Sequence, residues 1–371
     1  MLTTLIFIIV LGVLIFVHEL GHFLAARASD IRVDAFKLGF GPKIFSWKSG
    51  ETEYGLNLIP FGGYVKIFGE NPSDESINGS NKERSFVHKS WWRQLLVLVA
   101  GVCFNFLFAW LIYIIVFTSG VTATTNGFDK YVNNFTNQRV MITYVNKDSP
   151  AEKAGIIVGD IVLGVHLASV SQAPNSLPIS VANIQDTINT SQGGPISFDI
   201  KRKDLSYIIQ ATSTQGLVEG KYAIGIGMDT VADMQLPIIP AILEGLHYTG
   251  IMIRETITGL FTFFASIFDG TANFSDISGP VGIAGIVGNA AQMGFTYLLM
   301  ITAIISINLG VINLLPFPAL DGGRTLFVIL ETIFRRKIPT TFVNIVNLVG
   351  FVLLMALMVV VTFKDIVKLI K

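Results

Sequence analysis

Long apolar segments constrain the fold of this chain more than any other feature. Three of them reach the roughly 20 residues that a bilayer-spanning helix needs: Leu2–Ala26, Leu95–Phe117 and Thr341–Phe363. A fourth, Tyr297–Leu315, is slightly short and ends at Pro316. The composition agrees, because only 14% of the 371 residues are charged, against about a quarter in soluble proteins. We therefore predict a polytopic α-helical membrane protein with about four transmembrane helices.

Charge and cysteine content exclude some classes of protein. The formal net charge is zero, so the chain lacks the basic surface that nucleic-acid binding requires. The single cysteine, Cys103, allows no internal disulfide. The apolar start Leu2–Val17 lacks a basic leading region and a small-residue cleavage site. We expect it to be retained as a transmembrane helix rather than removed as a signal peptide.

The segments between the spans differ in character. Ile44–Lys66 alternates as a β-hairpin does, with turns at Lys48–Glu51 and at Gly62-Gly63. Ser119–Pro237 has soluble composition and predicts a small β-rich domain. In Ile238–Phe268 polar residues interrupt apolar sequence, which favours helices on or dipping into the membrane surface. The expected parts are 1–118, with the hairpin at about 35–70, then 119–237, 238–296 and 297–371.

Basic residues indicate the orientation in the membrane. Ten Lys and Arg lie from Arg27 to Arg93, and Arg335-Arg336-Lys337 cluster between the last two spans. The positive-inside rule places both loops in the cytoplasm. Both termini and the β-rich domain are then expected outside it.

An HExxH motif, His18-Glu19-Leu20-Gly21-His22, ends the first span. Imidazoles four residues apart on a helix can reach one ion, with Glu19 at its side. Zn²⁺ held by two histidines and a third ligand leaves a position for water, whose proton Glu19 can accept. The alternative is a pair of surface histidines, but ionisable groups in a spanning helix cost about 2.5–3.5 kcal/mol each and persist mainly where they function. The motif predicts a zinc-dependent hydrolase.

Asp321 is the best candidate for the third ligand. It follows the proline-broken fourth span, and irregular backbone at membrane depth is tolerated where it lines a cavity. The next two residues, Gly322 and Gly323, let the backbone pass close to the site. The alternative is that Asp321 only caps a helix beginning near Arg324. Glu255 and Glu331 are weaker competitors for the ligand position.

Several other features allow two interpretations. Asn105, Asn308 and Asn313 are amides in apolar spans, where hydrogen bonding between helices is the default explanation. Near a peptidase centre they could instead hold a substrate backbone or an oxyanion, although for Asn105 we favour packing. The hairpin at Ile44–Lys66 could offer a strand edge to a peptide or be a simple amphipathic surface hairpin.

Taken together, the motifs resemble the site-2 protease family of intramembrane metalloproteases, and within it the RseP type of bacterial regulator. The resemblance covers most of the chain and rests on HELGH, Pro60–Lys66, Gly101 with Asn105, Ser149–Asp160, Ser278–Ile283 and the run NLLPFPALDGG from Asn313. It implies that His18, His22 and Asp321 bind one zinc ion and that Glu19 is the catalytic base. It also implies a substrate site shaped by Asn308, Asn313, Pro316 and Pro318, to which we add Gly62 and Gly63. The hairpin would re-enter the membrane, and the β-rich domain would be a single PDZ-like domain where the best-known members have two.

The resemblance further implies site-2 cleavage in regulated intramembrane proteolysis, in the inner membrane of a bacterium. The substrates would be single-pass membrane proteins, such as anti-sigma factors or remnant signal peptides, already shortened by a site-1 protease. The PDZ-like domain would filter substrates by size or bind a fresh C-terminus. The rival functions are an ion- or proton-coupled transporter, which explains the polar residues but not the HExxH spacing, and an inactive PDZ scaffold.

Overall fold

The computed structural model describes residues 2–70, 74–126, 128–167, 179–202, 205–218, 220–271 and 278–370. The chain forms two compact units. One combines Met1–Val116 with Ile238–Lys371, and the other is Phe117–Pro237. The identity of the second unit as a PDZ-like domain stays a prediction.

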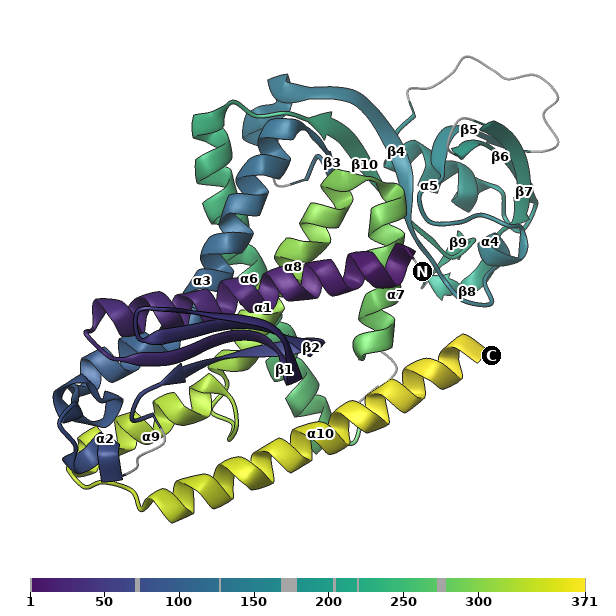
Figure 1. Ribbon diagram of the computed structural model, residues 1–371. Helices are drawn as coiled ribbons and strands as arrows, with labels where there is room; N and C mark the ends of the chain where they lie inside the picture. The colour runs from purple at the N-terminus through teal and green to yellow at the C-terminus, as the bar shows by residue number, and fades with distance from the viewer. Residues whose placement is uncertain are drawn as a thin grey trace. The chain divides into compact units, whose positions relative to one another are not determined.

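Long apolar helices dominate the first unit (Figure 1). In the described part of the chain, five helices are long and apolar enough to cross a membrane: α1 (Leu2–Ala28), α3 (Trp91–Ser119), α6 (Ile238–Phe268), α8 (Phe295–Leu314) and α10 (Thr340–Ile370). Shorter helices complete the unit, namely α2 (Asp74–Asn78), α7 (Pro280–Met293), α9 (Asp321–Phe334) and the 3-10 turns η1 (Lys82–Arg84) and η2 (Phe86–His88). These helices support the predicted multi-pass membrane fold.

Helix α6 differs from our expectation of several helices at the membrane surface. It is one continuous helix of 31 residues and a fifth candidate span. Its polar residues lie within the helix, and Arg254 and Glu255 pair with each other at 2.9 Å. It packs on α3, where the Trp110 indole donates to the carbonyl of Ile242 at 3.0 Å and Gly245 lies against Ile114.

The predicted hairpin is present but longer than expected. Strands β1 (Val33–Ser49) and β2 (Thr52–Ile67) pair antiparallel around Gly50, which has a φ of 63°. Residues 53–56 run parallel to 35–38 and residues 63–66 run antiparallel to them, so the chain reverses direction between 56 and 63, close to the predicted turn at Gly62-Gly63. Gly62, with a φ of 104°, lies at this reversal and adopts a conformation that favours glycine. As a result, residues 35–38 have Cα partners on both sides, at 53–56 and at 63–66.

The first unit is held together by close helix crossings. A Cβ on Gly21 of α1 would lie 2.5 Å from the carbonyl oxygen of Ala100 on α3, so the two backbones almost touch. Leu14 of α1 and Val287 of α7 are buried in one apolar cluster. At the start of α7 the Gly282 amide donates to the Asp365 carboxylate of α10 at 2.8 Å. This contact explains why small residues precede and follow Pro280.

The second unit is built on a six-stranded antiparallel sheet in the order β3-β10-β4-β5-β6-β7. The strands are β3 (Val121–Thr124), β4 (Phe135–Val145), β5 (Ile161–Leu167), β6 (Pro195–Arg202), β7 (Leu205–Thr212) and β10 (Ile226–Met234). A small sheet pairs β8 (Thr214–Val218) with β9 (Lys221–Ala223), and the helical segments are η3 (Asp129–Asn134), α4 (Pro150–Lys153) and α5 (Val181–Thr190).

Local signals and core packing explain the helices of this unit. The Ser149 and Ser180 hydroxyls accept hydrogen bonds from the amides that begin α4 and α5. Ile184 of α5 and Phe198 of β6 are buried in the core. Strands β9 and β10 are separate because Gly225, which lies between them, has a φ of 83°.

Candidate metal centre

Three side chains from the two ends of the chain converge in the first unit. His18 and His22 lie one turn apart on α1, and Asp321 is the first residue of α9. The two histidine Nε2 atoms are 3.2 Å apart. Asp321 Oδ2 lies 3.1 Å from His18 Nε2 and 3.2 Å from His22 Nε2. Both histidines are 8% exposed, so the group is nearly closed to solvent.

The donor set fits a zinc ion. Ligand atoms about 2.0–2.1 Å from a tetrahedral ion lie about 3.3–3.4 Å from one another, and the three atoms here are 3.1–3.2 Å apart. Asp321 Oδ2 is buried and accepts no hydrogen bond from any described residue. A buried carboxylate oxygen beside two imidazole nitrogens needs a positive charge. Two imidazoles and one carboxylate are also the ligands of many catalytic zinc sites.

The hydrogen bond behind His22 fixes which ring nitrogen faces the site. His22 Nδ1 lies 2.8 Å from the carbonyl oxygen of Val97 on α3. A carbonyl only accepts, so Nδ1 carries the proton and donates it. The Nε2 lone pair is then free to point at the metal, which is the usual arrangement behind a metal-binding histidine.

Asn105 of α3 takes the same position behind His18. Its side-chain amide is fully buried and lies 3.2 Å from His18 Nδ1. With the amide nitrogen toward the ring, Asn105 Oδ1 has no hydrogen-bond partner in the described chain. Rotating the side-chain amide by 180° places Oδ1 beside His18 Nδ1. Oδ1 then accepts the Nδ1–H hydrogen bond, and the lone pair of His18 Nε2 is free to bind a metal. We favoured packing for Asn105, but its side chain contacts a predicted metal ligand.

Gly101, between Val97 and Asn105 on α3, makes room for both rings. A Cβ there would lie 2.8 Å from His18 Cε1 and from His22 Cε1, and closer still to His22 Nε2. Any side chain at this position would collide with the two imidazoles. Gly63 of β2 has a related role, since a Cβ there would lie 3.2 Å from Glu19 Cγ.

The irregular segment between α8 and α9 sets the position of Asp321. Helix α9 begins at Asp321 itself, and no side chain caps it, so the interpretation of Asp321 as a mere cap is wrong. A Cβ on Gly322 would collide with the carbonyl oxygens of Leu314 and Leu315, which end α8. This glycine therefore lets the start of α9 lie against the end of α8. On the other side, Ala319 N donates to Asn347 Oδ1 of α10 at 3.3 Å.

A cavity of about 670 Å³ opens beside the three ligand candidates. Glu19 lines it, and so does one edge of the hairpin, residues 63–67 of β2. The Arg324–Glu70 ion pair lies in the same wall. The cavity thus combines a carboxylate, the metal-ligand set and an extended strand.

Only some of the other predicted site residues lie near the three ligand candidates or line the cavity. Asn313 Nδ2 is 3.5 Å from His18 Nε2, and Gly63 lines the cavity. Asn308 instead accepts a hydrogen bond from Thr256 of α6 at 2.9 Å. Pro316, Pro318 and Gly62 are outside the cavity lining, and Pro318 packs against Gly350. The substrate roles of this set stay predictions.

The competing ligands are engaged elsewhere. Glu255 pairs with Arg254, and Glu331 pairs with Lys337 at 2.8 Å. His88 lies 3.0 Å from the carbonyl oxygen of Ile77, and His166 lies 3.8 Å from Asp199. Asp321 is the carboxylate that reaches the two HExxH histidines.

Comparison with known proteins identifies the family. A family model described as peptidase family M50 matches residues 6–357. The chain is 36% identical over 357 residues to a Clostridium perfringens protein, covering 95% of each. It is 35% identical to a Clostridium acetobutylicum protein, covering 97% of this chain and 96% of that one. It is also 29% identical to zinc metalloprotease RasP of Geobacillus kaustophilus, covering 98% and 97%. The names of all three relatives describe zinc metalloproteases, and the chain therefore belongs to peptidase family M50.

Proposed function

We propose that this protein is an intramembrane zinc-dependent endopeptidase that cuts membrane-anchored proteins. The observation that carries the proposal is the meeting of His18, His22 and Asp321 in a unit made of candidate membrane spans. The family membership and the names of the relatives agree with it.

His18, His22 and Asp321 would hold one zinc ion. When bound, zinc supplies a Lewis acid that polarises the scissile carbonyl and makes water nucleophilic at neutral pH. Glu19 lines the same cavity and would accept the proton of the attacking water, then return it to the leaving amine. Val97 and Asn105 would hold the imidazoles with Nε2 toward the metal. Asn313, whose Nδ2 lies 3.5 Å from His18 Nε2, would donate to a developing oxyanion.

The hairpin would bind the substrate as an added strand. Residues 63–66 of β2 pair with 35–38 on one side, and within the described chain they have no strand partner on the other. This edge lines the cavity beside Glu19. Peptide bonds in a membrane helix are internally hydrogen-bonded, so hydrolysis requires local unwinding. An open strand edge offers the unwound segment new backbone partners.

The second unit would select substrates by their ends. A cavity of about 250 Å³ lies between α5 and the residues 221–226, and Gly225 lines it. Two loops could bind a terminal carboxylate, Ala223–Ile226 and Arg139–Ile142. The cavity favours Ala223–Ile226, because Arg139 is already paired with Asp233 at 2.9 Å. The unit would accept the new C-terminus of a protein that another protease has shortened.

The proposed substrates are single-pass membrane proteins of bacteria, such as anti-sigma factors or remnant signal peptides, after a first cut outside the cytoplasm. The basic loops around Arg27–Arg93 and Arg335–Lys337 favour a catalytic site toward the cytoplasm of the inner membrane. The PDZ-like unit and both termini would then lie outside. A transporter would need neither the HExxH spacing nor a strand edge beside it.

The test is cleavage of a membrane-anchored model substrate in proteoliposomes by wild type and Glu19→Gln. We expect the variant to keep its zinc and lose cleavage, because Gln cannot accept the proton. Glu255→Gln, which changes an exposed acid on α6, serves as the matched control and should cleave normally. Undiminished cleavage by Glu19→Gln would refute the proposed base.

A further inference from the structure

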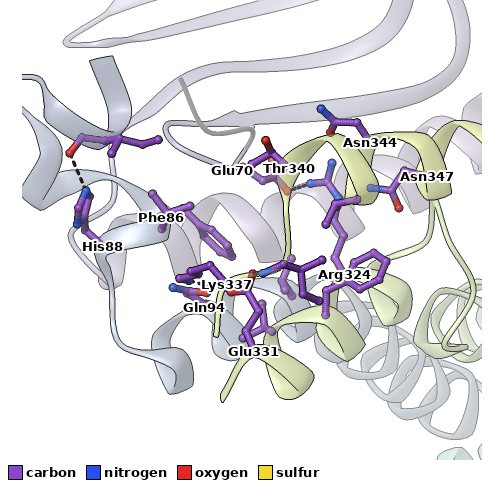
Figure 2. Close-up of a pocket in the computed structure, with 17 residues that line it drawn as sticks. Glu70, Phe86, His88, Gln94, Arg324, Glu331, Lys337, Thr340, Asn344 and Asn347 are labelled. Carbon is purple, nitrogen blue, oxygen red and sulfur yellow. Dashed lines mark hydrogen bonds and ion pairs between the residues drawn. The ribbon is translucent and has the colours of Figure 1, made fainter. Parts of the chain in front are cut away.

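Two neighbouring cavities in the first unit belong to neither the metal centre nor the strand edge. The larger, of about 340 Å³, lies among η2, the start of α3, α9 and the start of α10 (Figure 2). The smaller, of about 260 Å³, lies between the start of α3 and the end of α9. Both are lined by Val87, Gln94, Val328, Glu331 and Lys337, so they adjoin along one wall.

The larger cavity is mainly apolar. Its wall includes Phe86, Leu98, Phe327, Ile338 and Val343. The charged groups at its rim pair with each other, Arg324 with Glu70 and Lys337 with Glu331, as Figure 2 shows in part. A ligand in this cavity therefore meets hydrocarbon rather than a free charge, as an acyl chain would require.

The smaller cavity is basic. Lys89, Arg335, Arg336 and Lys337 line it, against the single acid Glu331. Lys89 pairs with Asp30 at 3.3 Å and Lys337 with Glu331 at 2.8 Å. Within the described chain no carboxylate pairs with Arg335 or Arg336. Two guanidinium groups that line one cavity and pair with no carboxylate of the described chain suit a phosphate group.

The position of the cavities matches a membrane boundary. The candidate spans α3 and α10 begin at Trp91 and Thr340, which line the smaller and the larger cavity respectively. Trp91 is half exposed, as an interfacial tryptophan is expected to be. Basic pockets beside spanning helices on the cytoplasmic side are suited to acidic lipid headgroups.

We propose that these joined cavities bind one anionic glycerophospholipid. Its phosphate lies at Arg335 and Arg336, and one acyl chain enters the apolar cavity against Val343. An anionic headgroup is favoured over a zwitterionic one, because Arg335 and Arg336 line the cavity while Lys89 and Lys337 are already paired with Asp30 and Glu331. The proposal does not depend on peptidase activity.

The experiment measures lipid binding to the delipidated full-length protein in neutral detergent, by native mass spectrometry. The probes are dioleoylphosphatidylglycerol, dioleoylphosphatidylcholine and glycerol 3-phosphate. We expect the first to bind most tightly. The double variant Arg335→Gln, Arg336→Gln should bind dioleoylphosphatidylglycerol about 30-fold more weakly. Each cation near an anionic lipid surface contributes about a factor of five, and the variant removes two of them. The matched control, Lys147→Gln with Lys153→Gln, removes the same charge from exposed positions in the second unit and should change nothing.

Val343→Trp tests the acyl chain separately. It should weaken binding of both lipids by filling the apolar cavity, while thermal unfolding shows whether the variant is folded. Equal affinity for the two lipids, or a double Arg variant that binds like the Lys control, would overturn the headgroup site. Glycerol 3-phosphate binding as tightly as the lipid, or a folded Val343→Trp that binds normally, would overturn the acyl chain.

Discussion

Replacing Gly101 by alanine should damage the metal centre without touching a ligand. The new Cβ would lie 2.8 Å from His18 Cε1 and from His22 Cε1. Carbon atoms in contact are normally about 3.5–4.0 Å apart, so each ring would have to retreat by about 0.7–1.2 Å. Zinc sites tolerate displacements of about 0.2 Å. The geometric error is therefore several times what the site can absorb.

The imidazoles have little room to retreat. His22 is bound to the carbonyl of Val97, one turn before Gly101 on the same helix, at 2.8 Å. His18 contacts Asn105, one turn after it. Loss of a hydrogen-bond partner behind a metal-binding histidine typically lowers metal affinity on the order of 10- to 100-fold. We expect Gly101→Ala to lower zinc affinity at least as much, and to lower the rate of cleavage in parallel. The helix itself should not suffer, because Ala is favoured over Gly by about 1 kcal/mol in helices.

The assay is competition for zinc between the purified protein and a chelator of known affinity. Gly12→Ala is the matched control, since it lies on the HExxH helix and a Cβ there meets no atom within 4 Å. It should bind zinc as wild type does. A folded Gly101→Ala with wild-type zinc affinity would show that the rings are not confined as described.

Three further predictions concern other contacts. Asn105→Leu should weaken zinc binding about 10- to 100-fold, because it removes the hydrogen-bond partner of His18. Asn105→Asp keeps an acceptor and should largely restore binding, as measured by the spectrum and metal affinity of the cobalt-substituted protein. Equal loss in both variants would show that Asn105 acts only in packing. Asp365→Ala removes the acceptor of the Gly282 amide and should lower thermal stability by about 1 kcal/mol, and an unchanged unfolding temperature would contradict the capping role. Hydrogen bonds from Arg139 lower the pKa of Asp233 to about 2, so the stability that they contribute is present above about pH 4 and is lost as the pH falls through the folded-state pKa. Amide-exchange protection of β10 in the whole protein should follow that loss, and Arg139→Gln should weaken the dependence, since Arg139 is the largest of the causes that lower this pKa, ahead of Thr122 and Asn137.

How much the sequence could predict depends on whether a signal is local. The HExxH spacing places two imidazoles on one helix face, so these residues could be read directly. Asp321 could be nominated because a proline-broken span leads to an aspartate at membrane depth. Neither Gly101 nor Asn105 could be assigned, because what they contact lies on another helix. The only sequence signal for their roles is their spacing, since Gly101 lies one helical turn before Asn105 on the second apolar span.

The errors in the secondary structure have physical causes. The Gly62-Gly63 pair indicates a turn, but the sequence does not show that residues 35–38 lie between 53–56 and 63–66, because that pairing joins residues far apart in the chain. In Ile238–Phe268, charged residues favoured several surface helices, yet α6 is continuous, because isolated charged residues do not by themselves end a helix.

The most direct test of the central claim is X-ray absorption at the zinc edge of the purified protein and of Asp321→Asn. Wild type should hold one zinc ion per chain, with two imidazoles and oxygen ligands at about 2.0–2.1 Å. The variant should lose most of its zinc or an oxygen ligand while both imidazoles stay. A wild-type spectrum with fewer than two imidazoles, or a spectrum and zinc content unchanged in Asp321→Asn, would contradict a metal centre formed by α1 and α9.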